Sequence, residues 1–171
     1  VESCEKPSFL VVKDAAVVQI DGSTIDCNYQ CGFLKQNTGR LLVNETEFLH
    51  SAHERMIDFT GADAKFARCS FMEGRLGFIC LSENAALMML ECDFFRASAE
   101  YGAAVYSDSL DNVSLTKCSF RDCKVRYLGA AVYFKYQKLG QVVKECVCSG
   151  CVPETDAVFN TYEDDFVLKI R

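Results

Sequence analysis

Six short segments of this chain are near-copies of one another, and their spacing constrains the fold more than any other feature. Each carries a small residue, cysteine in five of the six, and most have an aromatic residue two positions later. The copies occupy residues 24–29, 43–48, 66–71, 89–94, 115–120 and 143–148, so they start 19, 23, 23, 26 and 28 residues apart. A repeat of this length is typical of one turn of a β-solenoid. Such a turn cannot bury its apolar side chains alone, so the turns must stack around a common core.

The small residues define one column of the repeat and the aromatic residues define another. In a parallel solenoid, equivalent residues of successive turns lie about 4.8 Å apart, one above the other. The small column is Cys27, Thr46, Cys69, Cys92, Cys118 and Cys146. The aromatic column, two residues later and therefore on the same strand face, is Tyr29, Phe48, Phe71, Phe94, Phe120 and Cys148. We expect both columns to point into the core, as a ladder of cysteines and a stack of rings.

Two further columns predict a bend in each turn. The position three residues before the small column is mostly large and apolar, and it holds Thr24, Val43, Phe66, Met89, Leu115 and Val143. Residues at an odd spacing face opposite sides of a straight strand, so the chain must bend between these columns if both are buried. The position just before the small column is charged throughout: Asp26, Glu45, Arg68, Glu91, Lys117 and Glu145. From Glu45 onward the sign alternates, and because stacked opposite charges attract weakly, this favours the proposed register.

A second strand in each turn is indicated by glycine followed by small and apolar residues at 77–81, 102–106 and 129–134. The predicted fold is therefore all-β, a single-stranded right-handed parallel β-helix of about six to eight coils that forms one domain over residues 1–171. We expect residues 1–23 to be an opening coil or N-terminal cap and residues 24–151 to be the repeat coils. Residues 152–171 depart from the pattern, which is typical of a C-terminal cap or docking segment.

The alternation of Cys-x-Phe with Gly-Ala-Ala-Val-Tyr over residues 24 to 151 resembles the repeats of the polymorphic outer membrane protein family. That family pairs a Phe-x-x-Asn motif with Gly-Gly-Ala-Ile. Here the second glycine is Ala103 or Ala130, and the asparagine position holds Gly74, Ala97 or Cys123. The resemblance implies a right-handed parallel β-helix, display at the cell surface or secretion, and a role in adhesion.

Composition excludes some partners. The net charge is −6 and the basic residues are scattered among acids, which argues against nucleic-acid binding. No apolar run approaches the roughly 20 residues that span a bilayer. The amino end lacks the pattern of a signal peptide, and a start at Val1 is typical of a processed form or a fragment.

The eleven cysteines allow three interpretations. The favoured one is a set of reduced, buried thiols that pack as small apolar groups. The second is disulfide bonding of Cys27 with Cys31, of Cys118 with Cys123, or among Cys146, Cys148 and Cys151. The third is zinc binding by Cys148 and Cys151, although the second pair of ligands is missing and His50 and His53 lie four coils away.

An enzymatic function has its best case in the outward column after the cysteines, which contains Asn28, Glu47, Ser70, Asp93 and Ser119. Glu47 and Asp93 are two coils apart, roughly 9.6 Å by strand spacing, which is close to the carboxylate separation of an inverting glycoside hydrolase. A solvated polar stripe explains the same residues. The acidic run 163–165 is interpreted as a solubilising patch. Asn44 and Asn112 begin N-glycosylation sequons, which have meaning only in a secreted protein.

The sequence therefore predicts a non-catalytic structural or interaction module, with no catalytic, cofactor-binding or metal-binding residues assigned. A rigid rod of this kind presents long flat surfaces to extended partners. We expect protein partners or a larger assembly, with a polysaccharide as another possibility. A carbohydrate-binding or carbohydrate-cleaving enzyme that uses Glu47 and Asp93 is the alternative. The resemblance implies the cell surface, and an intracellular assembly is the alternative location.

Overall fold

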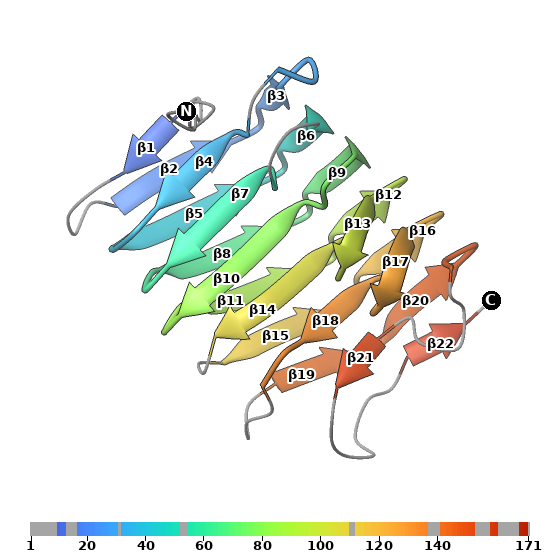
Figure 1. The fold of residues 1–171 in the computed structure, drawn as a ribbon. Helices are drawn as coiled ribbons and strands as arrows, with labels where there is room; N and C mark the ends of the chain where they lie inside the picture. The colour runs from blue at the N-terminus through green and yellow to red at the C-terminus, as the bar shows by residue number, and fades with distance from the viewer. Residues whose placement is uncertain are drawn as a thin grey trace, which may run out of the picture.

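The computed structural model describes residues 10–12, 17–30, 32–51, 55–109, 112–136 and 141–152, together with the main chain of 158–160 and 168–170. Every regular element in these ranges is a β-strand, and neighbouring strands pair in parallel. Each turn of the chain adds one strand to each of three sheets, so strands that are neighbours in a sheet come from successive turns (Figure 1). The expected all-β parallel solenoid is confirmed.

The strands of the three large sheets follow chain order. Sheet A contains β1 (Leu10–Val12), β4 (Leu34–Gln36), β7 (Ile57–Thr60), β10 (Ile79–Glu83), β14 (Val105–Ser109), β18 (Val132–Phe134) and β21 (Val158–Asn160). Sheet B contains β2 (Val17–Asp21), β5 (Arg40–Asn44), β8 (Asp63–Ala67), β11 (Ala86–Leu90), β15 (Val113–Thr116) and β19 (Gln141–Lys144). Sheet C contains β3 (Thr24–Asp26), β6 (Glu47–Ser51), β9 (Ser70–Gly74), β12 (Asp93–Phe95), β16 (Ser119–Arg121), β20 (Cys146–Ser149) and β22 (Leu168–Ile170). A small sheet D pairs β13 (Ser98–Tyr101) with β17 (Lys124–Leu128).

Regular turns run from β4 to β20, and there are five of them. The expected six to eight coils is therefore slightly too high, because the two ends add less regular layers. Among the inward side chains of β1 to β3, Val12 is buried, whereas four others are only partly buried: Leu10, Val18, Ile20 and Ile25. Beyond β20, the strands β21 and β22 continue sheets A and C. Most of residues 152–171 lies outside the described residues, so a cap or docking role for this segment stays a prediction.

The predicted bend lies at the charged column, between sheets B and C. In five successive turns the residue there has a left-handed main chain, with φ of 49° at Glu45, 52° at Arg68, 53° at Glu91, 53° at Lys117 and 55° at Glu145. A left-handed residue reverses the alternation of side chains, so apolar residues on both sides of it face inward. Two pairs in this column make ion pairs, Arg68 with Glu45 at 3.0 Å and Lys117 with Glu91 at 4.0 Å.

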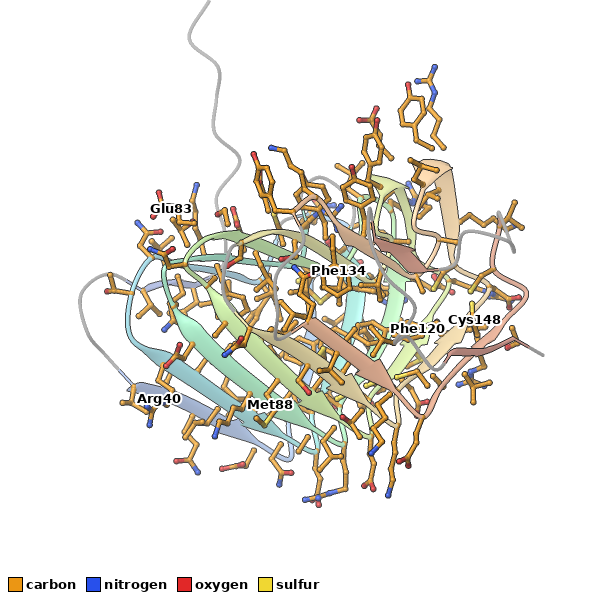
Figure 2. The ribbon with its side chains drawn as sticks, turned by 90° about the horizontal axis from the view of Figure 1, so that it is seen from below. Arg40, Glu83, Met88, Phe120, Phe134 and Cys148 are labelled. Atoms are coloured by element: carbon orange, nitrogen blue, oxygen red, sulfur yellow. The ribbon has the colours of Figure 1, made fainter. Side chains whose placement is uncertain are left out.

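A second left-handed column ends sheet C in each turn. It holds His50, Glu73, Arg96, Asp122 and Gly150, with φ between 53° and 63°. The residue that follows each of these is small and buried: Ser51, Gly74, Ala97, Cys123 and Cys151. These two bends and the corner between sheets A and B close the chain around the core, with Phe120 and Phe134 inside it and Arg40 and Glu83 outside (Figure 2).

The aromatic column forms a continuous stack inside sheet C. Phe48, Phe71, Phe94 and Phe120 are paired in register, and each has 0% of its surface exposed. Their ring centroids are 4.7, 4.8 and 5.2 Å apart, and successive planes differ by 6°, 9° and 11°. The prediction of an internal aromatic stack is confirmed for these four turns, and Cys148 continues the column as predicted.

The predicted register of the first repeat copy with the second is wrong. Ile25, and not Tyr29, pairs with Phe48, and Ile20, and not Thr24, pairs with Val43. The spacing to the second turn is therefore 23 residues, like the spacings that follow it. The apparent 19-residue spacing arose because Cys27-x-Tyr29 resembles the repeat four residues after the true match at Ile25. Tyr29 instead lies in a left-handed turn with φ of 54°, outside the core.

Glycine marks the entry to sheet A, as expected. Gly102 and Gly129 have φ of 51° and 70°, and a Cβ atom on either would lie within 2.4 Å of the main-chain oxygen of Val105 or Val132. The alanines that follow them are completely buried, which lets the main chain approach the interior closely.

Candidate functional site

The predicted acidic pair lies on one outward row of sheet C. Glu47, Ser70, Asp93 and Ser119 pair in register along β6, β9, β12 and β16. Asn28 is not in this row, because Thr24 pairs with Glu47 and Asn28 follows the next bend. The Ser119 hydroxyl donates a hydrogen bond to Asp93. Two strand spacings separate Glu47 from Asp93, or about 9.6 Å.

A polar groove runs beside this row, along the second bend. Its first part, a hollow of about 410 Å³, is lined by Tyr29, Glu73, Gly74, Arg75, Arg96 and Ser98. Its second part, about 500 Å³, shares Arg96 and Ser98 and continues to Lys124 and Val152. The Tyr29 hydroxyl donates to Glu73, and this bond holds the pKa of Glu73 below its usual value. Glu73 thus remains ionised beside Arg96, whose guanidinium lies 3.5 Å from it.

A cluster of tyrosines covers the outer side of sheets A and D. We call it the tyrosine face, and it consists of Tyr101, Tyr106, Tyr127 and Tyr133. Tyr106 and Tyr133 pair in register on β14 and β18, with ring centroids 5.5 Å apart and planes 8° apart. Tyr101 lies 5.0 Å from both Tyr127 and Tyr133, so the four rings form an unbroken chain of contacts.

Arg55 fixes the tyrosine face to the fold. Its guanidinium donates hydrogen bonds to the main-chain oxygens of Tyr101 at 2.5 Å, Gly102 at 2.8 Å and Ile79 at 3.2 Å. It also lies 5.0 Å from the centre of the Tyr106 ring. Burial lowers the pKa of Arg55 from its usual value, and the neighbouring Asp58 opposes that shift. Arg55 therefore holds strands from three turns together beneath the rings.

The tyrosine rings pack against one another and against two arginines. Tyr106 is sandwiched between Tyr133 and Arg55, and Tyr127 has Tyr101 on one side and Arg126 5.2 Å from its centre. Tyr127 is 44% exposed despite these contacts. A surface of this type offers phenolic hydrogen-bond groups and ring edges, which suit a protein partner. A sugar ring would instead need an open aromatic face.

Cys80 lies next to this face, in the outward row that runs from Asp58 through Cys80 to Tyr106. Burial raises the pKa of the Cys80 thiol to about 11, against the opposing effect of Arg55. The thiol is therefore protonated near neutral pH and is a poor nucleophile.

The disulfides considered between Cys118 and Cys123, and among Cys146, Cys148 and Cys151, do not form, since Cys118, Cys123, Cys146 and Cys151 are thiols. The Cys118 thiol donates to the main-chain oxygen of Thr116, and the other stacked cysteines make similar bonds. Hydrogen bonds with Cys146 and Cys92, together with burial, raise the pKa of Cys118. Cys31, which was paired with Cys27 in this interpretation, lies outside the described residues.

The described ranges contain no group of three His, Cys, Asp or Glu side chains arranged to hold a metal ion. His50 is four strands from β20 in sheet C and hydrogen-bonds Asp26 at 2.9 Å, so it is remote from Cys148 and Cys151. His53 and the acidic run 163–165 fall outside the described part. Asn44 accepts a hydrogen bond from Arg68 at 2.7 Å, whereas Asn112 is exposed.

Sequence reasoning missed the tyrosine face, although half of it could have been found. The repeated Gly-Ala-Ala-Val-Tyr segments contain Tyr106 and Tyr133 at the same position of successive turns. Tyr101 and Tyr127 come from β13 and β17, whose register shifts between Ala99 and Tyr101, so no fixed spacing relates them.

The comparison with protein families matches residues 8–164 to a family described as the right handed beta helix region. This chain belongs to the right-handed β-helix family. The narrower likeness to polymorphic outer membrane proteins stays a prediction. No curated protein and no solved structure matches the chain. The described residues include no helix with the length and hydropathy needed to cross a membrane.

Proposed function

We propose that this β-helix is a non-catalytic interaction module whose tyrosine face binds a protein partner. The observation that carries the proposal is the chain of ring contacts from Tyr127 through Tyr101 and Tyr133 to Tyr106, on a face that remains partly open to solvent. Tyrosine is enriched in protein interfaces because it combines a large contact area with a hydrogen-bonding group.

The rigidity of the support favours binding. Ordering flexible side chains on association costs about 0.5–1.5 kcal/mol each. Here Arg55 already fixes the main chain at Tyr101 and Gly102, and the rings pack on each other before any partner arrives. Little further ordering is needed when a partner binds.

Site-specific crosslinking tests this proposal. A photoreactive amino acid replaces Tyr127, and a matched probe replaces Leu76, which is also exposed, at 44%, but lies between β9 and β10. After irradiation in an extract of the native source, the probe at Tyr127 should yield a discrete crosslinked protein that the probe at Leu76 does not. Equal labelling from both positions, or none from Tyr127, would contradict the proposal.

A carbohydrate-active enzyme is the second candidate, favoured by one observation: Glu47 and Asp93 point outward from one row of sheet C with only Ser70 between them. The spacing of about 9.6 Å suits an inverting mechanism, in which one carboxyl protonates the leaving oxygen and the other activates water. Glycan cleavage that is lost in both Glu47→Gln and Asp93→Asn would establish this function in place of the first.

A further inference from the structure

The outer face of sheet B exposes several large apolar side chains beside the charged side chains of Arg40, Asp63 and Lys65. Nine large apolar side chains are exposed among the described residues, and four of them belong to this one sheet: Val17, Met88, Leu90 and Val142. Met88 is 49% exposed and Leu90 is 39% exposed. Figure 2 labels Arg40 and Met88, which both point outward from this sheet. A shallow hollow of about 190 Å³ extends over β2 to β11 of this sheet, and the residues that line it include Lys65, Ala67, Met88 and Leu90.

One outward row of this face changes character along the solenoid axis. It comprises Asp21, Asn44, Ala67, Leu90, Thr116 and Lys144, paired in register from β2 to β19. Asp21 lies at one end of the row and Lys144 at the other. Asn44 and Thr116 come next, and Ala67 and Leu90 occupy the middle.

We infer that sheet B is the contact face of a homodimer in which two copies pack face to face with antiparallel solenoid axes. The twofold axis lies between the two faces and runs parallel to the strands. It reverses the order of the turns, but each row still lies opposite the same row of the second copy. Asp21 then meets Lys144 of the second copy, Asn44 meets Thr116, and Ala67 meets Leu90. Twofold interfaces require this kind of self-complementary surface.

The hollow supports the same arrangement. Ala67 leaves room between its neighbours in the row, and Leu90 of the second copy stands opposite it and fills that space. The contact occurs twice in the dimer, so the two copies of Leu90 form apolar contacts next to the twofold axis, beside the row that contains Lys65 and Met88. Lys144 also has Glu145 at 3.7 Å, and Asp21 accepts a hydrogen bond from Gln19 at 2.7 Å, so both charges are positioned at the rim.

The size of the face predicts a weak dimer. Six strands about 4.8 Å apart and roughly 15 Å long present on the order of 400 Å² of flat surface. Stable complexes usually bury about 800 Å² on each partner. We therefore expect dimerisation that depends on protein concentration, with monomers at low concentration.

Sedimentation of the full chain over a concentration series tests the inference. The wild-type protein should shift from monomer to dimer as its concentration rises. Leu90→Asp should weaken the dimer about tenfold or more, because it places two charges next to the twofold axis, each opposite Ala67 of the other copy. The matched control Leu76→Asp, on a different surface, should leave the dimer unchanged. Wild-type protein that is monomeric at every concentration would overturn the inference.

Charge exchange tests the antiparallel geometry itself. Asp21→Lys and Lys144→Asp should each weaken the dimer, because each places like charges opposite one another. The double variant restores opposite charges and should recover an affinity close to wild type. Failure of the double variant to recover would overturn the antiparallel arrangement. A dimer that resists Leu90→Asp but is lost in Tyr127→Ala would place self-association on the tyrosine face instead.

Discussion

The phenylalanine stack inside sheet C and the tyrosine face outside sheets A and D are built by the same geometry. Phe48 and Phe71 stack at 4.7 Å and 6°, and Tyr106 and Tyr133 stack at 5.5 Å and 8°. Both pairs arise because parallel strands place equivalent residues one above the other. The phenylalanines are completely buried, whereas the tyrosines remain partly exposed and carry hydroxyls.

This difference shows how a solenoid can separate stability from recognition. A side chain that faces inward packs against the neighbouring turns and stabilises the fold. A side chain of the same turn that faces outward contributes little to folding stability. Variants of the inner stack should therefore change the free energy of unfolding, and variants of the outer face should change binding.

The largest effect is expected for Phe94→Ala, which empties the middle of the stack. It should lower the free energy of unfolding by about 3–5 kcal/mol, measured by denaturant titration. The adjacent Phe95→Ala is a matched control, since Phe95 faces outward beneath Arg96 and Arg121. It should cost roughly 1 kcal/mol. Equal losses would mean that the inner and outer faces of sheet C are wrongly assigned.

Arg55→Met should have the next largest effect, about 2 kcal/mol, because it leaves three main-chain oxygens without their charged donor. Arg126→Met provides the comparison, as Arg126 lies over the Tyr127 ring. Its cost should stay below about 0.5 kcal/mol. If Arg126→Met destabilises as much as Arg55→Met, then Arg55 does not anchor the tyrosine face.

Glu91→Ala should cost less than about 1 kcal/mol, since its ion pair with Lys117 is exposed to solvent. A comparison with Glu91→Gly separates the contribution of the ion pair to stability from the cost of the left-handed main-chain conformation. Glycine adopts the left-handed conformation without penalty, so this variant should be the more stable of the two. Thermal unfolding of both variants measures the difference, and a less stable glycine variant would contradict a left-handed bend.

Asp58→Asn should stabilise the protein slightly at neutral pH. Burial raises the pKa of Asp58 in the folded state above 3.8, so the ionised form opposes folding. The unfavourable contribution of the ionised Asp58 carboxylate to folding is complete at pH values above its pKa in the folded state. It disappears as the pH falls through that pKa and below the pKa in the unfolded state. The variant should gain a few tenths of a kcal/mol at pH 7 and nothing below roughly pH 3.5. A gain that is independent of pH would indicate another cause.

The repeat in the sequence was sufficient to predict the parallel turns, a bend between the apolar and small columns, and the stack from Phe48 to Phe120. These features depend on local pattern and on neighbours one turn away, which the spacing records. The alignment of Tyr29 was wrong because Cys27 and Tyr29 imitate the repeat just after the true match at Ile25. The tyrosine face includes residues from segments whose length varies between turns, so the repeat spacing does not record it. The hydrogen bonds by which Arg55 links three turns have no sequence signature.

The most direct test of this division compares wild-type protein with Tyr127→Ala in two assays on the same preparations. The free energy of unfolding should change by less than about 0.5 kcal/mol, because Tyr127 lies on the outer surface and is 44% exposed. The protein captured by crosslinking through a neighbouring probe at Arg126 should fall about tenfold or more, as expected for a tyrosine that contributes strongly to an interface. Undiminished capture, or a loss of stability comparable to that of Phe94→Ala, would contradict the assignment of recognition to the outer face.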